Sequence, residues 1–370
     1  MIRTFVSAPA SPFERGREFG AEFAVDIQRT AGHYTDLMSE IAGRAVDLAE
    51  YGPDALEAIA AFSLDAADEI RGIAEGAGED VLRIAALNAR TEVLALLGAR
   101  FRGECSTVVK LDANGERPPI SVQTWDWVDI FADDWLFWTI QHPGGTVVHT
   151  ITEFGVLGKI GVNNRGVGVH FNLLHHDTDG AGIGVPIHVL ARSVLDQSAH
   201  IGQALDLVGK AVLSASSALT LIGADVDGSS AISAELSPIG PRFVQPDDDG
   251  LLIHTNHFLD PVLAAGDLEP RIGPDTWLRH STLRRRLARR LNLTVADVTE
   301  AMSSHHGGGG AVCCHPERGA SLPGRWQTLA TVSLDVQSGT LAFHEGGPCR
   351  LGAASDHSKE HTSNTIGALL

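Results

Sequence analysis

A single cysteine, Cys105, lies at the junction of two differently patterned parts of the chain. The residues before it are predicted to be helical, whereas the residues after it have β character over 106–111 and again over 120–125. Residues 112–115 lie between these runs and carry an Asn-Gly turn signal, so a β-hairpin is expected with Cys105 at the start of its first strand. If the preceding peptide bond is cut, the freed α-amine, with a pKa of about 8, can take the thiol proton and Cys105 becomes a nucleophile.

Two interpretations of this thiol remain open from the local sequence. A cysteine at the start of a strand is commonly a small, inert, buried side chain. The polar and charged residues around it indicate an accessible thiol instead. These flanking residues are Arg102, Gly103, Glu104 and Ser106.

A carboxylate lies close to Cys105 on the partner strand of the predicted hairpin. Asp126 stands between Trp125 and Trp127, and indole rings on both sides remove water from a carboxylate in part. In this position Asp126 can hold an α-ammonium group or position the thiol. The alternative is that Asp126 caps the turn after the strand.

Asn256, in the stretch His254-Thr-Asn-His257, follows another predicted strand. A side-chain amide at the end of a strand is a suitable donor for an oxyanion. The more common role of such an asparagine is to satisfy the hydrogen bonds of a loop.

Three histidines and two cysteines gather within residues 303–316. A zinc hydrolase is therefore an alternative class of enzyme, with His305, His306, Cys314 and His315 as its ligands. The spacing fits no structural zinc motif, because Cys314 and its neighbour Cys313 do not easily share a tetrahedral ion and no Cys-x-x-Cys pair exists. We therefore expect no metal site and no cofactor.

An arginine-rich helix is predicted over residues 276–292, with a buried stripe of Leu283, Leu287 and Leu291. Its arginines indicate either a site for a phosphate or coenzyme A tail, or a solvated face. We favour the solvated face, which is the usual role of such a charge run. The arginines are Arg279, Arg284, Arg285, Arg286, Arg289 and Arg290.

Composition limits the possible partners. The chain has 370 residues, of which 44% are hydrophobic, enough for a large core. Its net charge of −18 argues against nucleic acid and anionic membranes as partners. No apolar run approaches the roughly 18 residues of a membrane span, and no secretory signal is recognisable. Four cysteines fit a reducing compartment, so a soluble, cytoplasmic protein is expected.

The order of the predicted elements favours a layered fold. Three helices are expected before Cys105, the first beginning at the capping sequence Ser11-Pro-Phe-Glu14. After Cys105, blocks of strands and helices follow one another without a regular βαβ alternation. This order indicates segregated layers rather than a doubly wound parallel sheet.

Several stretches match one family in the same order along most of the chain, namely residues 11–20, 69–78, 87–92, 123–127, 159–167, 172–175, 254–257 and 314–316. In these stretches and at the Cys105 junction, the chain resembles the acyl-coenzyme A:6-aminopenicillanic acid acyltransferase family, self-processing N-terminal nucleophile enzymes of peptidase type C45. The resemblance implies an α+β fold, a four-layer αββα sandwich with two antiparallel sheets, as a single domain over residues 1–370. It also implies self-cleavage between Glu104 and Cys105, after which the fragments 1–104 and 105–370 stay associated.

The resemblance also implies roles for individual residues. Cys105 would be the nucleophile, Asp126 the supporting carboxylate, Asn256 the oxyanion donor and Arg325 the arginine ahead of the last strand pair. We expect the substrate to contact Trp125, Trp127, Asn172 and His257.

The chain departs from the family pattern at three places. Glu104 precedes the expected nucleophile where the fungal enzyme of this family has glycine, so a less flexible residue stands at the expected cut. The Gln-Thr-Trp-Asp stretch lies three residues further from the cysteine than in the fungal enzyme. Ahead of the glycine run, the family has an acidic residue followed by a histidine. This chain has His305 followed by His306 at these positions.

The predicted function is that of an N-terminal cysteine amidohydrolase or acyltransferase acting on a small-molecule amide or acyl thioester, with hydrolysis favoured. Coenzyme A-dependent acyl transfer of the penicillin-biosynthesis type is an alternative. A non-catalytic, unprocessed homologue that binds an acylated small molecule is a further one. A homo-oligomer is possible.

Overall fold

The structure is a computed structural model that describes residues 2–100, 105–112, 115, 117–290, 292–306, 311–316 and 319–353. No helix in these ranges is both long enough and apolar enough to cross a membrane. The helices are α1 (Pro12–Glu22), α2 (Ala24–Ala42), α3 (Gly52–Phe62), α4 (Leu64–Ala77), α5 (Val81–Asn88), α6 (Arg90–Leu96), α7 (Ile187–Gln197), α8 (Ile201–Lys210), α9 (Glu269–Ile272), α10 (Thr276–Leu287) and α11 (Val295–Met302). The short 3₁₀ helices are η1 (Leu48–Tyr51), η2 (Asp129–Phe131), η3 (Leu263–Gly266), η5 (Leu322–Gly324) and η6 (Pro348–Ala353).

The strands form two sheets. The eight-stranded sheet has the order β1-β4-β5-β6-β7-β8-β9-β10, and the five-stranded sheet has the order β11-β2-β3-β12-β13. The strands are β1 (Arg3–Ser7), β2 (Ser106–Lys110), β3 (Ile120–Val128), β4 (Trp135–Gln141), β5 (Val147–Glu153), β6 (Ile160–Asn163), β7 (Val167–Leu173), β8 (Ser217–Asp225), β9 (Gly228–Leu236), β10 (Arg242–Val244), β11 (Leu251–His254), β12 (Trp326–Asp335) and β13 (Thr340–Glu345).

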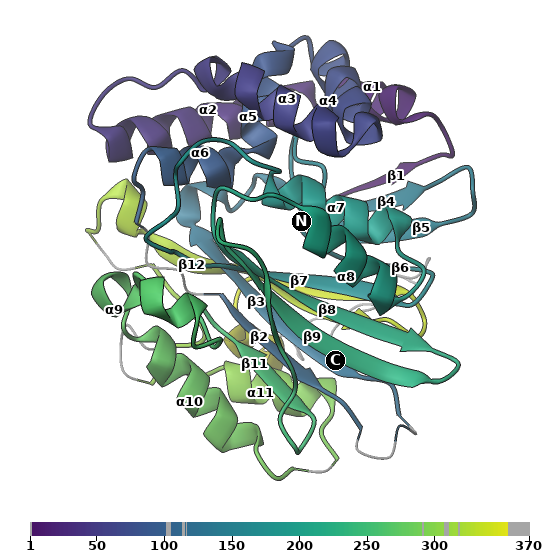
Figure 1. The fold of residues 1–370 in the computed structure, drawn as a ribbon, viewed down its shortest axis with the longest axis vertical. Helices are drawn as coiled ribbons and strands as arrows, with labels where there is room; N and C mark the ends of the chain where they lie inside the picture. Colours follow the sequence, from purple (N-terminus) through teal and green to yellow (C-terminus); the bar gives the residue numbers. More distant parts are fainter. Residues whose placement is uncertain are drawn as a thin grey trace.

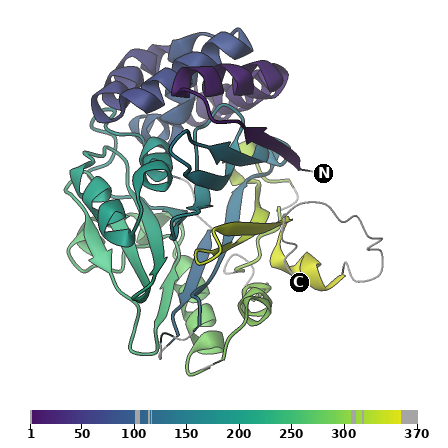
Figure 2. The ribbon, with the colours of Figure 1, turned by 90° about the vertical axis from the view of Figure 1, so that its right-hand side faces the viewer.

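The two sheets lie face to face between layers of helices (Figures 1 and 2). Helices α7 and α8 pack on the eight-stranded sheet, and α10 and α11 pack on the five-stranded sheet, where a separate apolar cluster joins them to β2, β3 and β11. This arrangement is the predicted α+β, αββα sandwich, so that prediction is confirmed. Helices α1 to α6 form a further layer over one end of the sheets (Figure 1).

The predicted hairpin is present, with β2 and β3 antiparallel and Ser106 opposite Thr124. The expectation of two antiparallel sheets is wrong at one edge, because β1 pairs with β4 in parallel. Strands β1, β4 and β10 were not predicted. Strand β4 is buried along most of its length and so lacks the alternation that marks a half-buried strand.

Glycines let two helices of the upper layer pack with their backbones almost in contact. Side chains on Gly16 and Gly20 of α1 would collide with the backbone of α4, and side chains on Gly72 and Gly76 of α4 would collide with α1. The predicted start of α1 is confirmed, since the Ser11 hydroxyl accepts a hydrogen bond from the Glu14 amide. Two stretches that carry the family resemblance therefore form one helix pair.

A polar contact joins the sheets beside the predicted site. His170 of β7 lies between Gln123 and Ser121 of β3, with Nδ1 3.1 Å from Gln123 Oε1 and Nε2 3.2 Å from Ser121 Oγ. Gln123 also donates to the carbonyl of Phe171 and accepts from its amide. The strand that carries Asp126 is thereby held against the opposite sheet.

The buried His170 gives the protein a pH-dependent stability. Burial lowers its pKa to about 3, whereas an unfolded histidine titrates near 6.5. Between these values the unfolded chain binds a proton that the folded chain does not. The free energy of unfolding should therefore decrease as the pH falls from about 6.5, by up to about 1.4 kcal/mol per pH unit for this residue.

Replacing His170 with glutamine keeps a polar side chain but removes the titration. Urea unfolding of His170→Gln between pH 6.5 and 4 should show a pH slope smaller than that of the wild type by up to one proton. His200→Gln, at an exposed histidine, serves as the matched control. An unchanged slope in His170→Gln would contradict this account.

Candidate active site

Cys105 lies directly before β2 and is almost fully buried, with 5% of its surface exposed. Its Sγ accepts a hydrogen bond from the Asp126 amide at 3.4 Å and lies 3.5 Å from the Asp126 carbonyl oxygen. The register of the hairpin causes this contact, because β2 and β3 run antiparallel and bring the start of one strand to the end of the other. The structure thus brings Cys105 and Asp126 together.

The carbonyl oxygen of Cys105 is held from two directions. Asn172 Nδ2, from β7 of the opposite sheet, donates to it at 3.2 Å, and Arg279, from α10, donates to it at 3.1 Å. Thr107 orients the asparagine by donating to its Oδ1 at 2.7 Å. These contacts fix the backbone of Cys105, while the Asp126 amide holds its Sγ.

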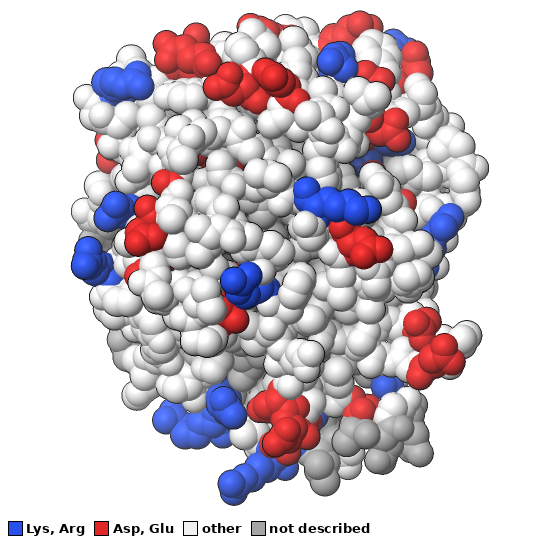
Figure 3. All heavy atoms as spheres, in the orientation of Figure 1, with Lys and Arg blue, Asp and Glu red and all other residues white. Residues whose placement is uncertain are grey.

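Arg279 is a site residue that the sequence interpretation missed. The favoured solvated face holds for Arg284, Arg285, Arg286, Arg289 and Arg290, which are exposed. Basic side chains gather toward the lower end of the molecule, where α10 lies (Figures 1 and 3). The solvated face is wrong for Arg279, which has no exposed surface. Arg279 precedes Leu283 and Leu287 at intervals of four residues, so its place on the buried stripe was a signal of this role. The helix ends at Leu287, and Leu291 lies outside the described residues.

Asn256 lies two residues after β11, beside Cys105. Its Nδ2 donates to the Leu173 carbonyl at 2.9 Å, and its Oδ1 accepts from Arg279 at 3.1 Å. An amide nitrogen carries two hydrogens, so a second one is available for an oxyanion. Arg279 fixes the orientation of this amide, because the guanidinium can only donate.

A pocket of about 20 Å³ opens at Cys105, which is room for about one water molecule. Its walls combine apolar rings with polar and charged side chains from both sheets and from α6 and α7. The lining residues are Arg90, Thr91, Cys105, Trp125, Asp126, Trp127, Lys159, Phe171, Leu173, His188, Asn256 and Trp326.

Lys159 is the second site residue that the sequence interpretation missed. Its ammonium lies over the indoles of Trp125 and Trp127, at 4.1 and 5.6 Å from the ring centres, and 3.3 Å from the Glu153 carboxylate. Burial lowers the pKa of Lys159 to about 8, although Glu153 opposes this shift. The group can therefore change its charge near neutral pH, inside the pocket that holds the thiol.

The thiol itself is held in its neutral form. Burial and, to a smaller extent, the negative charge of Asp126 raise the pKa of Cys105 to about 12, while Lys159 and Arg279 oppose this shift. Since Asp126 opposes the thiolate, it is not the group that activates the sulfur. A carboxylate in this position is suited to hold a cation next to the thiol.

Two of the predicted site residues lie elsewhere among the described residues. Arg325 forms a bidentate pair with Asp129, with Nη2 2.7 Å from Oδ1 and Nε 3.1 Å from Oδ2, and does not line the Cys105 pocket. His257 stacks on Trp277 and shares a hydrogen bond of 3.0 Å with Thr276, also outside the pocket lining. Their predicted roles stay predictions.

The remaining predicted residues differ in placement. Trp125 and Trp127 line the pocket. Asn172 is not among the lining residues but donates a hydrogen bond to the Cys105 carbonyl. Glu104, and with it the predicted cut, lies outside the described residues.

Comparisons with known proteins place this site in a family context. The family described as acyl-coenzyme A:6-aminopenicillanic acid acyl-transferase matches residues 113–350. The 40 kDa form of the acyl-coenzyme A:6-aminopenicillanic-acid-acyltransferase of Emericella nidulans is 34% identical over 218 residues. These residues are 58% of this chain and 58% of that protein, so the alignment spans little more than half of the relative's length.

Two solved structures are similar at low sequence identity. A Caenorhabditis elegans ortholog of N-acylethanolamine-hydrolyzing acid amidase has a TM-score of 0.44 and 14% identity, over 63% of this chain and 93% of that chain. Penicillin V acylase from Agrobacterium tumefaciens has a TM-score of 0.42 and 15% identity, over 65% of this chain and 86% of that chain. The match over residues 113–350 covers more than half of the sequence, and the chain therefore belongs to the acyl-coenzyme A:6-aminopenicillanic acid acyl-transferase family.

Proposed function

We propose that the protein is a self-processing N-terminal cysteine amidohydrolase or acyltransferase that acts on a small-molecule amide or acyl thioester. One observation carries the proposal: Cys105, Asp126 and Asn256 line one pocket, and Asn172 and Arg279 hold the cysteine backbone. Membership of the acyltransferase family supports the same class of chemistry. A zinc hydrolase receives no support from this pocket, whose lining carries none of the four ligands predicted for that enzyme.

Self-cleavage is the first step of the proposed mechanism. Cys105 Sγ attacks the carbonyl carbon of Glu104, the carbon–nitrogen bond to Cys105 breaks, and the nitrogen takes the thiol proton. The resulting thioester between Glu104 and the sulfur is then hydrolysed by water, which releases a free thiol and a free α-amine. The contacts of Asn172 and Arg279 with the Cys105 carbonyl keep the residue in place while its own amide bond breaks.

Turnover then uses the groups that cleavage has exposed. The α-amine takes the thiol proton, the sulfur attacks the substrate carbonyl, and Asn256 Nδ2 donates to the oxyanion. The leaving amine or thiol takes the proton and departs, which leaves a thioester on Cys105. Asp126 holds the α-ammonium form during this step, and Lys159 adds a positive charge to the same pocket.

The acyl part of the substrate is proposed to be apolar. A second small pocket adjoins the first and shares Thr91, Trp127 and Leu173 with it. Leu94 and Ala99 add to its apolar wall. We favour water over an amine as the acceptor, because water needs no binding site of its own.

The two fragments are proposed to stay associated after the cut. Strand β1, which belongs to residues 1–104, pairs with β4 in the eight-stranded sheet. Across the same boundary, Arg90 of α6 forms a buried ion pair with Glu153 of β5. Separation would expose the core that helices α1 to α6 share with both sheets.

The first prediction from the proposed function concerns the nucleophile. Cys105→Ala should give one uncut chain with no measurable amidase or acyltransferase activity, because both steps need the sulfur. Denaturing gels and a thioester or amide hydrolysis assay measure the two results. Cys314→Ser, at another buried cysteine, is the matched control and should be cut and active; two fragments and full turnover in Cys105→Ala would refute the proposal.

The second prediction concerns the oxyanion donor. Asn256→Ala should lower kcat about 100- to 1,000-fold with a smaller change in KM, because the amide stabilises charge that develops in the transition state. Steady-state kinetics of the cleaved enzyme test this effect. Asn164→Ala, at an exposed turn asparagine, should leave kcat unchanged, and an equal loss in both variants would contradict the role of Asn256.

The third prediction concerns Arg279. Arg279→Met leaves the Cys105 carbonyl and Asn256 Oδ1 without this donor in a buried site, so the free energy of unfolding should fall by about 1–3 kcal/mol and self-cleavage should slow. Arg284→Met, on the exposed side of the same helix, is the control. Denaturant unfolding and a time course of fragment formation measure both effects. Equal behaviour of the two variants would show that Arg279 does not hold the site.

A further inference from the structure

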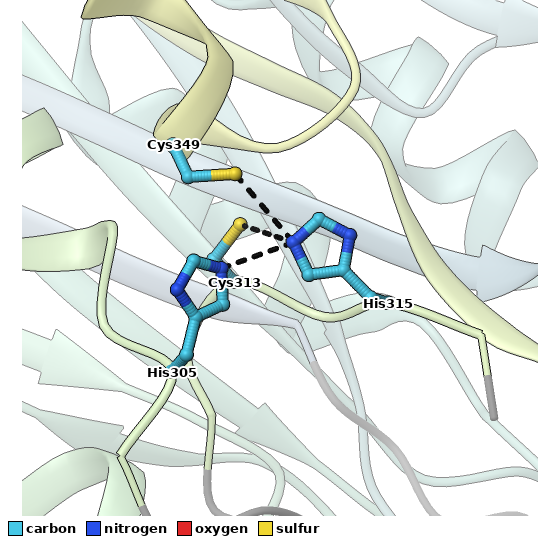
Figure 4. Close-up of side chains that lie close together, drawn as sticks. All are labelled: His305, Cys313, His315 and Cys349. Atoms are coloured by element: carbon cyan, nitrogen blue, oxygen red, sulfur yellow. Dashed lines mark hydrogen bonds between the residues drawn. The ribbon is translucent and has the colours of Figure 1, made fainter.

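A group of two histidines and two cysteines lies outside the Cys105 pocket (Figure 4). Nε2 of His315 lies 3.0 Å from Nε2 of His305, 3.6 Å from Cys313 Sγ and 3.5 Å from Cys349 Sγ. All four ligand atoms lie within 4.8 Å of one another. The side chains come from two segments, the loop after α11 and the turn η6 near the end of the described chain, and they point toward one another (Figure 4).

The three distances from His315 Nε2 are close to the edges of a zinc tetrahedron. With Zn–S bonds of about 2.3 Å and Zn–N bonds of about 2.05 Å, a tetrahedral angle places nitrogen and sulfur about 3.6 Å apart and two nitrogens about 3.3 Å apart. The observed nitrogen–sulfur distances are 3.5 and 3.6 Å, and the nitrogen–nitrogen distance of 3.0 Å is slightly shorter. We propose that His305, Cys313, His315 and Cys349 bind one Zn²⁺ ion in a closed, structural Cys₂His₂ site.

A metal ion explains why these atoms converge. A neutral imidazole nitrogen without a proton and a thiolate are both electron-pair donors, and four of them at one point repel one another unless a cation lies between them. A hydrogen bond between the two Nε2 atoms would account for the histidine pair alone. A neutral thiol could also donate to this nitrogen, but His315 Nε2 has only one N–H or one lone pair and cannot form a good hydrogen bond with His305 Nε2 and both sulfurs at once.

The backbone around the ligands is organised by contacts that need no metal. The Ser304 carbonyl accepts hydrogen bonds from the amides of Val312 and Cys313, at 2.9 and 3.1 Å, which closes the base of the loop. The Cys314 amide donates to the Thr328 hydroxyl at 3.0 Å, and the Thr328 amide donates to the Cys314 carbonyl at 3.1 Å. These bonds attach the cysteine segment to β12. The backbone that carries Cys313 and His315 therefore loses little conformational entropy when a metal ion binds.

The second segment is attached to the same strand. The Gly346 amide donates to the Leu329 carbonyl at 2.8 Å, and the Thr331 hydroxyl donates to the Gly346 carbonyl at 3.0 Å. Cys349 follows three residues later, in η6. Both halves of the proposed site are thus fixed to neighbouring residues of β12.

The earlier objection to a metal rested on adjacent cysteines, and the structure removes it. Cys313 and His315 are two residues apart, and their side chains point toward one another (Figure 4). Cys314 and His306, two of the ligands of the zinc hydrolase alternative, are not members of the group. Cys349 supplies the second sulfur from 36 positions beyond Cys313, a spacing that no short zinc motif contains.

The site is structural rather than catalytic. Four protein ligands fill a tetrahedral ion and leave no position for water or substrate. The ion would connect the loop after α11 to η6. The first of these segments is already hydrogen-bonded to Thr328 of β12 through Cys314. Because Thr328 pairs with Asp126 on β3, the clamp supports the strand pair that carries the active-site carboxylate.

Metal content tests the proposal directly. The full chain, purified without a histidine tag or chelator, should hold about one zinc per chain by elemental mass spectrometry. After removal of zinc, Co²⁺ should give the intense visible bands of a tetrahedral site together with a thiolate-to-cobalt charge-transfer band. A chain that takes up no metal, or one that is lighter by two hydrogens because Cys313 and Cys349 form a disulfide, would overturn the proposal.

Ligand variants assign the site. Cys313→Ser and Cys349→Ser should each lower the bound zinc at least about tenfold, whereas the neighbouring variants Cys314→Ser and His306→Ala should keep it. Circular dichroism and the appearance of the two cleavage fragments check that each variant is folded. Zinc that is retained in both ligand variants, or lost equally in the neighbouring variants, would refute the assignment.

Discussion

The carbonyl oxygen of Cys105 is the point on which the arrangement of the site depends. One hydrogen bond comes from Asn172 in the opposite sheet and one from Arg279 in the outer helical layer, so three layers of the sandwich meet at one backbone atom. Because Arg279 also holds the Asn256 amide, the same guanidinium orients both the proposed nucleophile and its proposed oxyanion donor. A displacement of any of these layers would therefore move both groups together.

The large hydrophobic core shields the polar groups around the Cys105 carbonyl from water. The Glu153 carboxylate joins Arg90, Tyr34 and Lys159 in a buried network that links the upper helices to the pocket. Removing one partner of such a network leaves an uncompensated buried charge, which is strongly destabilising. The same burial raises the pKa of the Cys105 thiol, so its proposed role as a nucleophile calls for a base next to the sulfur. The proposed cut supplies that base as the α-amine of Cys105 itself.

Local patterns in the sequence predicted the hairpin, the contact between Cys105 and Asp126, and the layered fold, because neighbouring residues determine strand alternation and turn chemistry. Arg279 and Lys159 could not be assigned in this way. The exposed arginines that follow Arg279 obscured its place on the buried stripe, and the position of Lys159 depends on packing against indoles from another sheet. The grouping of Cys349 with His305 was also beyond local patterns, since only the fold of β12 and β13 brings the two segments together. The parallel pairing of β1 with β4 was likewise beyond local patterns, because it joins segments that are far apart in the sequence.

The central claim is that Cys105 becomes the N-terminal residue of a catalytic fragment. The most direct measurement is the intact mass of the purified wild-type protein together with the first residue of its larger fragment. The account predicts two masses that sum to the chain plus one water, with the larger fragment beginning at Cys105. A single uncut chain of 370 residues that nevertheless turns over substrate, or a larger fragment that begins at any other residue, would contradict it.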